Sequence, residues 1–517
     1  SAYITSAAVS PFEPDTFLLG TSFSGLYITR DRGKTWSEYE DLTRPLYRGA
    51  GFLEEITSVV FHPANEAEAY IGVGFGNGLY HADLEKEKLT PLDFPGGDET
   101  DHIRQVYGTC TDGDPEQFIL HVHTERWSYV YDPAAEKWEK NPVRKEYIAE
   151  LETEKLERLR QAADKTGIYL KSWNASGEDL DTYITFLQEH GMNSLVVDVK
   201  DDHGRVTYNT ELEAPQQAGA VREHINMEKL LKTAHEHGIY VIGRIVTFQD
   251  PKLYRYNKYQ YAVWNYQQEG PWGHKIKVED EETEEVSWVQ REFWVDPFSE
   301  FAWDYNISIA EELQNLGIDE IQFDYIRFPS DGDMTGIHYR FKKEGMRRID
   351  AIESFLRLAR ERLSIPISTD LYGFNSWYRM GNWIGQNIEM VSHYVDAICP
   401  MYYPSHFPRD FLKDLAYFPR ARWIYREGSE RSGVISGGRS VIRPYVQAFL
   451  IGGELKYEEA EYTDYLIQQL EGAREGLASG FTLWNNSNRY YMVTRSLKEY
   501  TSGENEEMSG ENTALMD

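Results

Sequence analysis

Hydrophobic and polar positions follow two different patterns along the chain, and the change between them falls near residue 166. Before it, short runs alternate apolar and polar residues, which is typical of strands with one buried face. After it, amphipathic stretches lead into apolar runs, often through a glycine, as at Gly191, Gly238, Gly317 and Gly480. A helix that ends at a glycine before a strand gives this pattern. We therefore predict an all-β part followed by an alternating α/β part.

The second part contains eight strand units that alternate with helical stretches. The strands are expected near residues 167–171, 194–200, 239–246, 318–326, 366–372, 395–402, 441–447 and 480–485. Such alternation predicts a parallel sheet, and eight units predict a closed (β/α)8 barrel. An open doubly wound sheet is the alternative, but it usually has a glycine-rich phosphate loop after its first strand, and this sequence has none there. We predict an α/β fold with a (β/α)8 TIM barrel over residues 166–500.

The first part of the chain is repetitive. Ile-Thr-Ser at Ile4 recurs at Ile56, Gly-Leu-Tyr recurs in the same way, and a fainter third copy begins at Ile103. A period of about 50 residues with several short strands per copy is typical of propeller blades. We predict an all-β, propeller-like repeat domain over residues 1–143. Three blades do not close an ordinary propeller, so further blades, the next domain or a partner chain would complete it.

Three shorter segments have their own signatures. "TRDRGKTW", from Thr29 to Trp36, resembles the Asp-box of sialidase-type propellers, in which the aspartate shapes a turn and is not catalytic. Residues 144–165 are charged with apolar residues at helical spacing, and they are predicted to form a helical linker. Residues 501–517 contain few apolar side chains and are predicted to be a disordered tail.

Side chains on the lumen side of the predicted barrel turn polar near the carboxyl ends of the strands. Because side chains alternate along a strand, each strand has one set facing the helices and another facing the lumen. The lumen set includes Asp198, Lys200, Arg244, Asp324 and Asp370. Active sites of such barrels lie at this end. Buried charges cost several kcal/mol unless they are paired, so a purely structural network of ion pairs is the alternative interpretation.

Two carboxyl groups at neighbouring strand ends are what glycoside hydrolysis requires, one as nucleophile or base and the other as acid. Asp324 and Asp370 end consecutive strands, so their carboxyl groups are expected to lie several ångströms apart. We expect Lys200 and Arg327 to hold one carboxylate ionised, while partial burial raises the pKa of the other. Asp198 is the alternative partner for Asp324.

Further residues at the same end are expected to bind the substrate. Aromatic rings stack on the apolar faces of sugars, and the chain has 36 Tyr and 13 Trp. The predicted substrate-binding residues are Trp173, Asp198, Lys200, Asp202, Arg244, Arg327, Tyr372, Trp377, Tyr402, Tyr403, His406 and Trp484.

Charge and composition restrict the partners. A net charge of −32 argues against nucleic acid and against an anionic membrane surface. The sequence has no apolar run of about 18 residues, so no membrane insertion is predicted. Its two cysteines, Cys110 and Cys399, lie in different predicted domains, which excludes a disulfide framework and a cysteine-based zinc site. We expect no redox cofactor and no metal.

Six motifs follow one another in the barrel region. They are SLVVDVKDDHGRVTY, FWVDP, GIDEIQFDYIRFPSDG, STDLYG, DAICPMYYPSHF and FTLWNNSNRY. Together, from Thr166 to Tyr491, they resemble a bacterial glycoside hydrolase TIM-barrel family, long described as a domain of unknown function and grouped with glycosidase barrels. The resemblance implies a glycosidase fold and activity, and it implies no particular substrate.

An aspartate at the end of the fourth strand is also similar to the alpha-amylase and alpha-galactosidase groups, where it is the nucleophile. This resemblance implies that Asp324 is the nucleophile. Those groups place the acid after strand five or six, which implies Asp370. Alpha-amylases have an arginine two residues before the nucleophile, whereas this chain has Gln322. An inverting mechanism, or a pairing of Asp324 with Asp198, therefore stays open.

We predict an extracytoplasmic glycoside hydrolase, secreted or periplasmic, that cleaves a poly- or oligosaccharide by a two-carboxylate mechanism. One alternative is an inactive barrel that binds carbohydrate or serves as a scaffold, assembled as a homo-oligomer through the incomplete propeller. Another is a metal-dependent hydrolase that uses Asp198, Asp201, Asp202 and His203.

Overall fold

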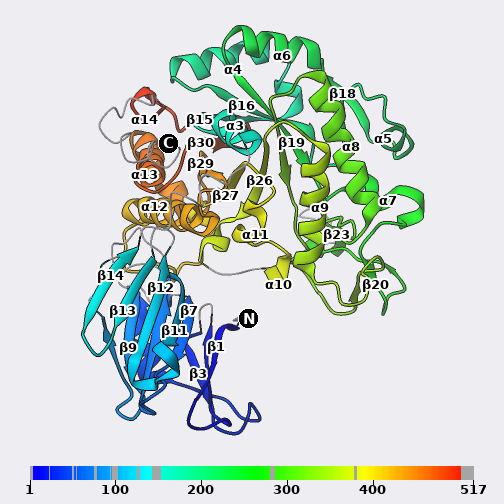
Figure 1. Ribbon diagram of the computed structural model, residues 1–517. Helices are drawn as coiled ribbons and strands as arrows, with labels where there is room; N and C mark the ends of the chain where they lie inside the picture. Colours follow the sequence, from blue (N-terminus) through cyan, green and yellow to red (C-terminus); the bar gives the residue numbers. More distant parts are fainter. Residues whose placement is uncertain are drawn as a thin grey trace.

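Figure 1 shows the computed structural model of the 517-residue chain. It describes residues 4–21, 24–48, 52–53, 55–74, 78–92, 95, 103–124, 128–141, 153–279, 286–377 and 381–501. Residues 502–517 of the predicted tail and 144–152 of the predicted linker lie outside these ranges. Within the described residues, none of the helices combines the length and the apolar character needed to cross a membrane.

Three four-stranded antiparallel sheets form the N-terminal part, and the strands of each sheet lie in sequence order (Figure 1, blue to cyan). The first sheet has β1 (Ile4–Val9), β2 (Phe17–Thr21), β3 (Leu26–Thr29) and β4 (Ser37–Glu38). The second has β7 (Ile56–Phe61), β8 (Glu68–Val73), β9 (Leu79–Asp83) and β10 (Lys88–Pro91). The third has β11 (Ile103–Cys110), β12 (Phe118–Thr124), β13 (Ser128–Asp132) and β14 (Lys137–Asn141). The repeated Ile-Thr-Ser sequence thus begins the first strand of the first two sheets.

The turn with the Asp-box-like sequence is held by its aspartate. The Asp31 carboxylate accepts hydrogen bonds from the Thr35 N–H and hydroxyl and from the Thr29 hydroxyl. The hydrogen bonds from Thr35 and Thr29 hold the pKa of Asp31 at about 2. Asp31 therefore acts within the turn that joins β3 to β4.

Eight parallel strands close a barrel in the C-terminal part, which confirms the predicted fold class (Figure 1). The strands are β15 (Lys165–Leu170), β16 (Ser194–Lys200), β19 (Tyr240–Val246), β24 (Glu320–Asp324), β26 (Ile367–Tyr372), β27 (Ala397–Met401), β29 (Tyr445–Gln447) and β30 (Gly480–Trp484). The outer helices are α4 (Gly177–Glu189), α6 (Met227–Glu236), α8 (Glu300–Leu316), α9 (Arg348–Arg362), α11 (Ile388–Ser392), α12 (Tyr417–Ser436) and α13 (Glu459–Glu475). A further helix, α3 (Thr153–Ala162), packs at the amino end of the barrel, where the Ala162 carbonyl accepts a hydrogen bond from Arg443.

Both parts also contain shorter helices and strands outside these sheets and the barrel. In the N-terminal part they are α1 (Glu40–Thr43), β5 (Tyr47–Arg48) and β6 (Phe52–Leu53). Around the barrel they are β17 (Val206–Tyr208), α5 (Glu213–Gln217), β18 (Val221–Ile225), α7 (Pro251–Tyr259), β20 (Trp264–Asn265), β21 (Gly270–Pro271), β22 (Lys275–Glu279), β23 (Val286–Gln290), β25 (Ile337–His338), α10 (Gly381–Ile384), β28 (Val441–Ile442) and α14 (Lys498–Thr501).

Pairs of buried polar side chains occupy two layers of the barrel lumen. Near the amino ends of the strands, the Arg443 guanidinium donates to both oxygens of Glu320, and both side chains are fully buried. One layer higher, the Tyr445 hydroxyl donates to Gln322 Oε1 at 2.5 Å, and Gln322 Nε2 donates to Cys399 Sγ at 3.2 Å. The barrel interior is therefore a packed core that supports the opposite, carboxyl end of the strands.

Candidate active site

Arg244, on β19, lies at the centre of a group of carboxyl groups at the carboxyl end of the barrel. Its Nη1 donates to Asp198 Oδ1 at 2.6 Å, and its Nε and Nη2 donate to Asp324 Oδ2 at 3.0 and 2.6 Å. Nη2 also donates to Asp202 Oδ1 at 3.2 Å, and Nε lies 4.0 Å from Asp370 Oδ2. We call these five residues the carboxylate cluster. All five were predicted site residues, and the structure brings them together.

Strand register explains this convergence. Asp198 pairs with Arg244 across β16 and β19, and Val246 pairs with Asp324 across β19 and β24. Phe323 pairs with Thr369 across β24 and β26, so the next residues along, Asp324 and Asp370, lie side by side. In parallel strands, residues in register have side chains on the same face.

Asp324 accepts N–H groups on both oxygens. Besides the two bonds from Arg244, its Oδ1 accepts the backbone N–H of Tyr325 at 2.6 Å. Tyr325 holds a φ of 53°, in the left-handed region, which is costly for a residue with a bulky side chain. The three N–H donors give Asp324 the surroundings of a carboxylate anion.

Asp370 has the opposite environment. It is buried, and its Oδ1 has no hydrogen-bond partner among the described residues. Burial raises its pKa well above the ordinary value, and the charge of Asp324 and a hydrogen bond with Asp324 raise that pKa further. A neighbouring negative charge disfavours ionisation, so both causes act to favour the protonated form of Asp370. The two adjacent carboxyl groups thus lie in different surroundings.

Asp198 is a second carboxyl group with a perturbed pKa. Burial raises its pKa to about 7, although the nearby Arg244 opposes that shift. The Tyr169 hydroxyl donates to Asp198 Oδ2 at 2.5 Å, and the Tyr169 ring stacks on Trp484 with ring centroids 3.9 Å apart. Sequence reasoning gave Tyr169 no role, although its position on the lumen side was the available signal.

The raised pKa of Asp198 makes stability depend on pH. Between the ordinary pKa of 3.8 and the folded value of about 7, the folded chain keeps a proton that the unfolded chain has lost. Stability therefore falls as the pH rises through this window. We expect the free energy of unfolding, measured by urea denaturation, to fall more in the native protein than in Asp198→Asn between about pH 5 and about pH 8.

Asp304→Asn is the matched control for that measurement, because Asp304 is a largely exposed carboxylate on the outer helix α8. Its unfolding should follow the native protein at every pH. Equal pH slopes for Asp198→Asn and the native protein would contradict the assignment.

The Arg327 guanidinium lies among three aromatic rings, those of Trp294, Tyr325 and Tyr372. The Arg327 guanidinium lies 4.7 Å from the ring centroids of both Trp294 and Tyr372 and 5.3 Å from that of Tyr325. It donates to the Phe328 carbonyl at 3.1 Å. The arginine that contacts Asp324 is Arg244, whereas we expected Arg327 beside a carboxylate.

Lys200 faces away from the lumen. The pairing of β16 with β19 is irregular between Asp198 and Lys200, and such a bulge turns the following side chain to the other face. Lys200 Nζ forms an ion pair with Asp250 Oδ2 at 2.8 Å, with both side chains fully buried. Simple alternation placed Lys200 in the lumen, and the bulge makes it a structural ion pair.

Trp377 and Tyr402 lie in the core between the barrel strands and α12. The Tyr402 hydroxyl donates to the Gly428 carbonyl at 2.6 Å and lies 2.7 Å from the hydroxyl of Ser376. Trp377 packs edge-on against Tyr402 with ring centroids 5.9 Å apart. The structure does not bring these two predicted residues to the cluster.

Among the other predicted residues, Tyr403 and Trp484 lie next to the cluster. Tyr403 is buried with Trp484 in one small group of side chains, and the Trp484 ring centroid is 5.2 Å from the Arg244 guanidinium. His406 lies 5.4 Å from Tyr403, ring to ring, and burial lowers its pKa. Trp173 is half-exposed in the turn that follows β15. Trp484, Tyr403 and Trp173 are the aromatic candidates for contact with a sugar.

The residues of the metal-site alternative form a turn. Asp201 Oδ1 accepts the backbone N–H groups of His203 and Arg205, both at 2.9 Å. In the part of the chain that the structure describes, no three His, Cys, Asp or Glu side chains form a group that could hold a metal ion.

Comparison with known proteins gives one match that spans most of the barrel. Residues 167–490 match the model of a family described as "putative glycosyl hydrolase domain". A probable oligoxyloglucan-reducing end-specific xyloglucanase of Neosartorya fischeri is 36% identical over 74 residues, which are 14% of this chain. The chain spans only 9% of the length of that curated relative.

Solved structures are also similar. The glycoside hydrolase domain of PgaB (BpsB) from Bordetella bronchiseptica is 12% identical, with a TM-score of 0.43, over 65% of this chain and 98% of that one. A hypothetical protein from Ruminiclostridium thermocellum is 35% identical, with a TM-score of 0.33, over 39% of this chain and 96% of that one.

Proposed function

This chain belongs to the family described as "putative glycosyl hydrolase domain", and we propose that it uses Asp324 and Asp370 to hydrolyse a glycosidic bond in a poly- or oligosaccharide. The observation that carries the proposal is this adjacent pair. One member is surrounded by N–H donors, and the other has a pKa raised by burial and by its neighbour. Glycoside hydrolysis needs one ionised and one protonated carboxyl group.

In the proposed reaction, Asp324 is the nucleophile or the base. Its Oδ1 and Oδ2 are already held by Tyr325 and Arg244, which fixes the direction in which its remaining lone pairs point. Asp370 supplies the proton that the leaving oxygen of the sugar must receive.

Asp324 and Asp370 interact before any sugar binds, because a hydrogen bond with Asp324 is one cause of the raised pKa of Asp370. A sugar that enters between the two carboxyl groups replaces this interaction. The proton of Asp370 is then free for the glycosidic oxygen. We expect Asp202, the most exposed carboxylate of the cluster, and Trp484 to contact the same sugar, because both lie beside Arg244.

The test is hydrolysis of a panel of purified polysaccharides, measured as new reducing ends. We expect the native protein to release them from at least one polymer. Asp324→Asn and Asp370→Asn should each lower the rate by about 10²–10⁴, the usual contribution of a catalytic acid or base. Asp304→Asn on the outside of α8 should leave it unchanged.

Native-like activity in Asp324→Asn would refute the assigned chemistry. The anomeric form of the first product, read by proton NMR, then distinguishes a retaining from an inverting reaction.

A further inference from the structure

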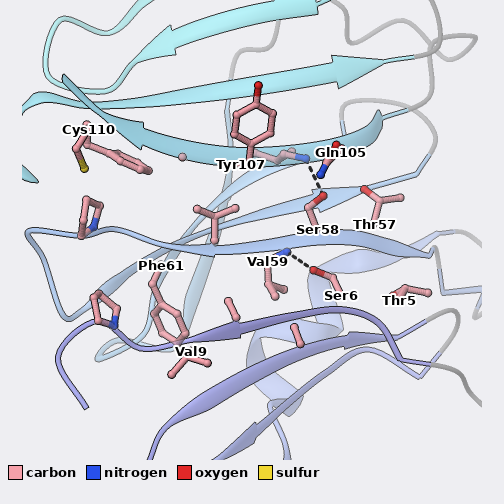
Figure 2. Close-up of a pocket in the computed structure, with 18 residues that line it drawn as sticks. Thr5, Ser6, Val9, Thr57, Ser58, Val59, Phe61, Gln105, Tyr107 and Cys110 are labelled. Atoms are coloured by element: carbon pink, nitrogen blue, oxygen red, sulfur yellow. Dashed lines mark hydrogen bonds between the residues drawn. The ribbon is translucent and has the colours of Figure 1, made fainter. Parts of the chain in front are cut away.

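The three N-terminal sheets are joined by the same contact twice (Figure 2). At the first joint, Ser6 Oγ on β1 accepts the N–H of Val59 on β7 at 2.9 Å. At the second, Ser58 Oγ on β7 accepts the N–H of Val106 on β11 at 2.7 Å. Ser6 and Ser58 hold the same place in the Ile-Thr-Ser repeat, so repeated sequence builds a repeated joint.

Apolar residues that are buried in the first strands of the second and third sheets are exposed in the first sheet. Ile56 and Ile103 begin β7 and β11 and are fully buried, and Phe61 near the end of β7 is 9% exposed. The matching residues of β1 are Ile4 and Val9, which are 66% and 56% exposed. The first sheet thus presents to solvent the face that the second and third sheets bury against a preceding sheet.

The third sheet exposes the surface that, in the second sheet, packs against the next sheet. In the second sheet, Tyr70 is 3% exposed and packs on Phe118 of the third sheet at 5.9 Å, ring to ring. Strand register gives His121 the corresponding place in the third sheet, opposite Tyr107. Tyr107 is 38% exposed and stacks on His121 at 4.8 Å. An aromatic surface thus stands where the second sheet has its contact with the third.

The first strands of the three sheets surround one hollow. A cavity of about 500 Å³ is lined by residues of β1, β7 and β11, including Ser6, Val59 and Tyr107 (Figure 2). In a propeller, the inner strands of the blades surround a central channel. The cavity is therefore on the side where a channel would form.

We propose that the N-terminal sheets of two copies of this chain close into one ring, the first sheet of each copy packing on the third sheet of the other. Three sheets are too few to close, whereas twice that number falls within the range of about four to eight blades. A two-fold axis makes the two new joints identical, which is the commonest symmetry of protein dimers. A second copy fits these surfaces because each chain exposes both of them, the apolar face of its first sheet and the aromatic face of its third sheet.

The test measures molecular mass by sedimentation velocity at about 1–100 μM, the range in which a specific dimer of moderate affinity assembles. We expect a dimer. Ile4→Asp and Tyr107→Asp each place an unpaired charge in both joints, and each should raise the dissociation constant at least about a hundredfold. Leu455→Asp, which changes an equally exposed leucine of the barrel, should dimerise normally.

Mixing the two variants is the decisive measurement. A mixed dimer of Ile4→Asp with Tyr107→Asp has both charges in one joint and leaves the other joint native. The mixture should therefore form more dimer than either variant alone. Both residues are exposed within one chain, so thermal unfolding should show folded monomers. A native protein that stays monomeric, or a mixture that dimerises no better than its components, would overturn the proposal.

Discussion

Replacing Arg244 by methionine is expected to abolish hydrolysis and to lower the free energy of unfolding by about 3–5 kcal/mol. The buried guanidinium is the shared donor to Asp198 and Asp324. Methionine fills much of the space but leaves these carboxyl groups without a counter-charge, and they must then take up protons or stay unpaired. Protonation removes the anionic Asp324 that the proposed reaction needs, and an unpaired Asp324 loses the two N–H donors that orient it.

Urea denaturation and the reducing-end assay measure the two effects separately. Arg244→Lys should recover part of the stability, because the charge remains, and little of the activity, because a single ammonium cannot reproduce the two-sided fork. Arg362→Met is the control, since its guanidinium pairs with Asp304 and Glu311 on the outside of the barrel. It should cost less than about 1 kcal/mol. An active Arg244→Met would contradict the proposed role.

Arg443→Leu is expected to be the most destabilising change that leaves the catalytic groups in place. Arg443 and Glu320 are both fully buried, so removing the arginine leaves a carboxylate with no counter-charge, at a cost of about 3–5 kcal/mol. The double variant Arg443→Leu with Glu320→Leu removes both charges and should regain most of that loss. Thermal or urea unfolding of the three proteins measures the effect.

The hydrolytic activity of the same variants shows whether the pair of Arg443 and Glu320 is structural or takes part in catalysis. The pair lies below the layer of Gln322 and Tyr445, and so the double variant should hydrolyse substrate at close to the native rate wherever it is folded. A double variant as unstable as Arg443→Leu would show that leucine side chains do not fit this part of the lumen.

The barrel and most of its cluster could be read from sequence because the relevant patterns are local. Alternation along a strand follows from backbone geometry, and it placed Asp198, Arg244, Asp324 and Asp370 on one side. Glycine caps marked where strands begin, as at Gly317, whose φ of 95° ends α8. Eight strands were therefore located to within a few residues.

The features that could not be predicted from the sequence depend on contacts between strands. The bulge that turns Lys200 outward exists only in the pairing of β16 with β19. In β27 both faces are apolar, so polarity could not show that Tyr402 faces α12. The strained backbone of Tyr325 and the direct contact of Asp324 with Asp370 also follow from the assembled barrel.

The filled lumen restricts how a long saccharide can use this barrel. Beneath the cluster, the pair of Gln322 and Tyr445 and then the pair of Glu320 and Arg443 close the interior. A polymer therefore cannot thread through the barrel; it lies across the open end or enters as a chain terminus. Both fragments leave by the side on which the next segment arrives. For a polymeric substrate of the proposed reaction, release of both fragments through this one opening then competes with bond cleavage as the slow step.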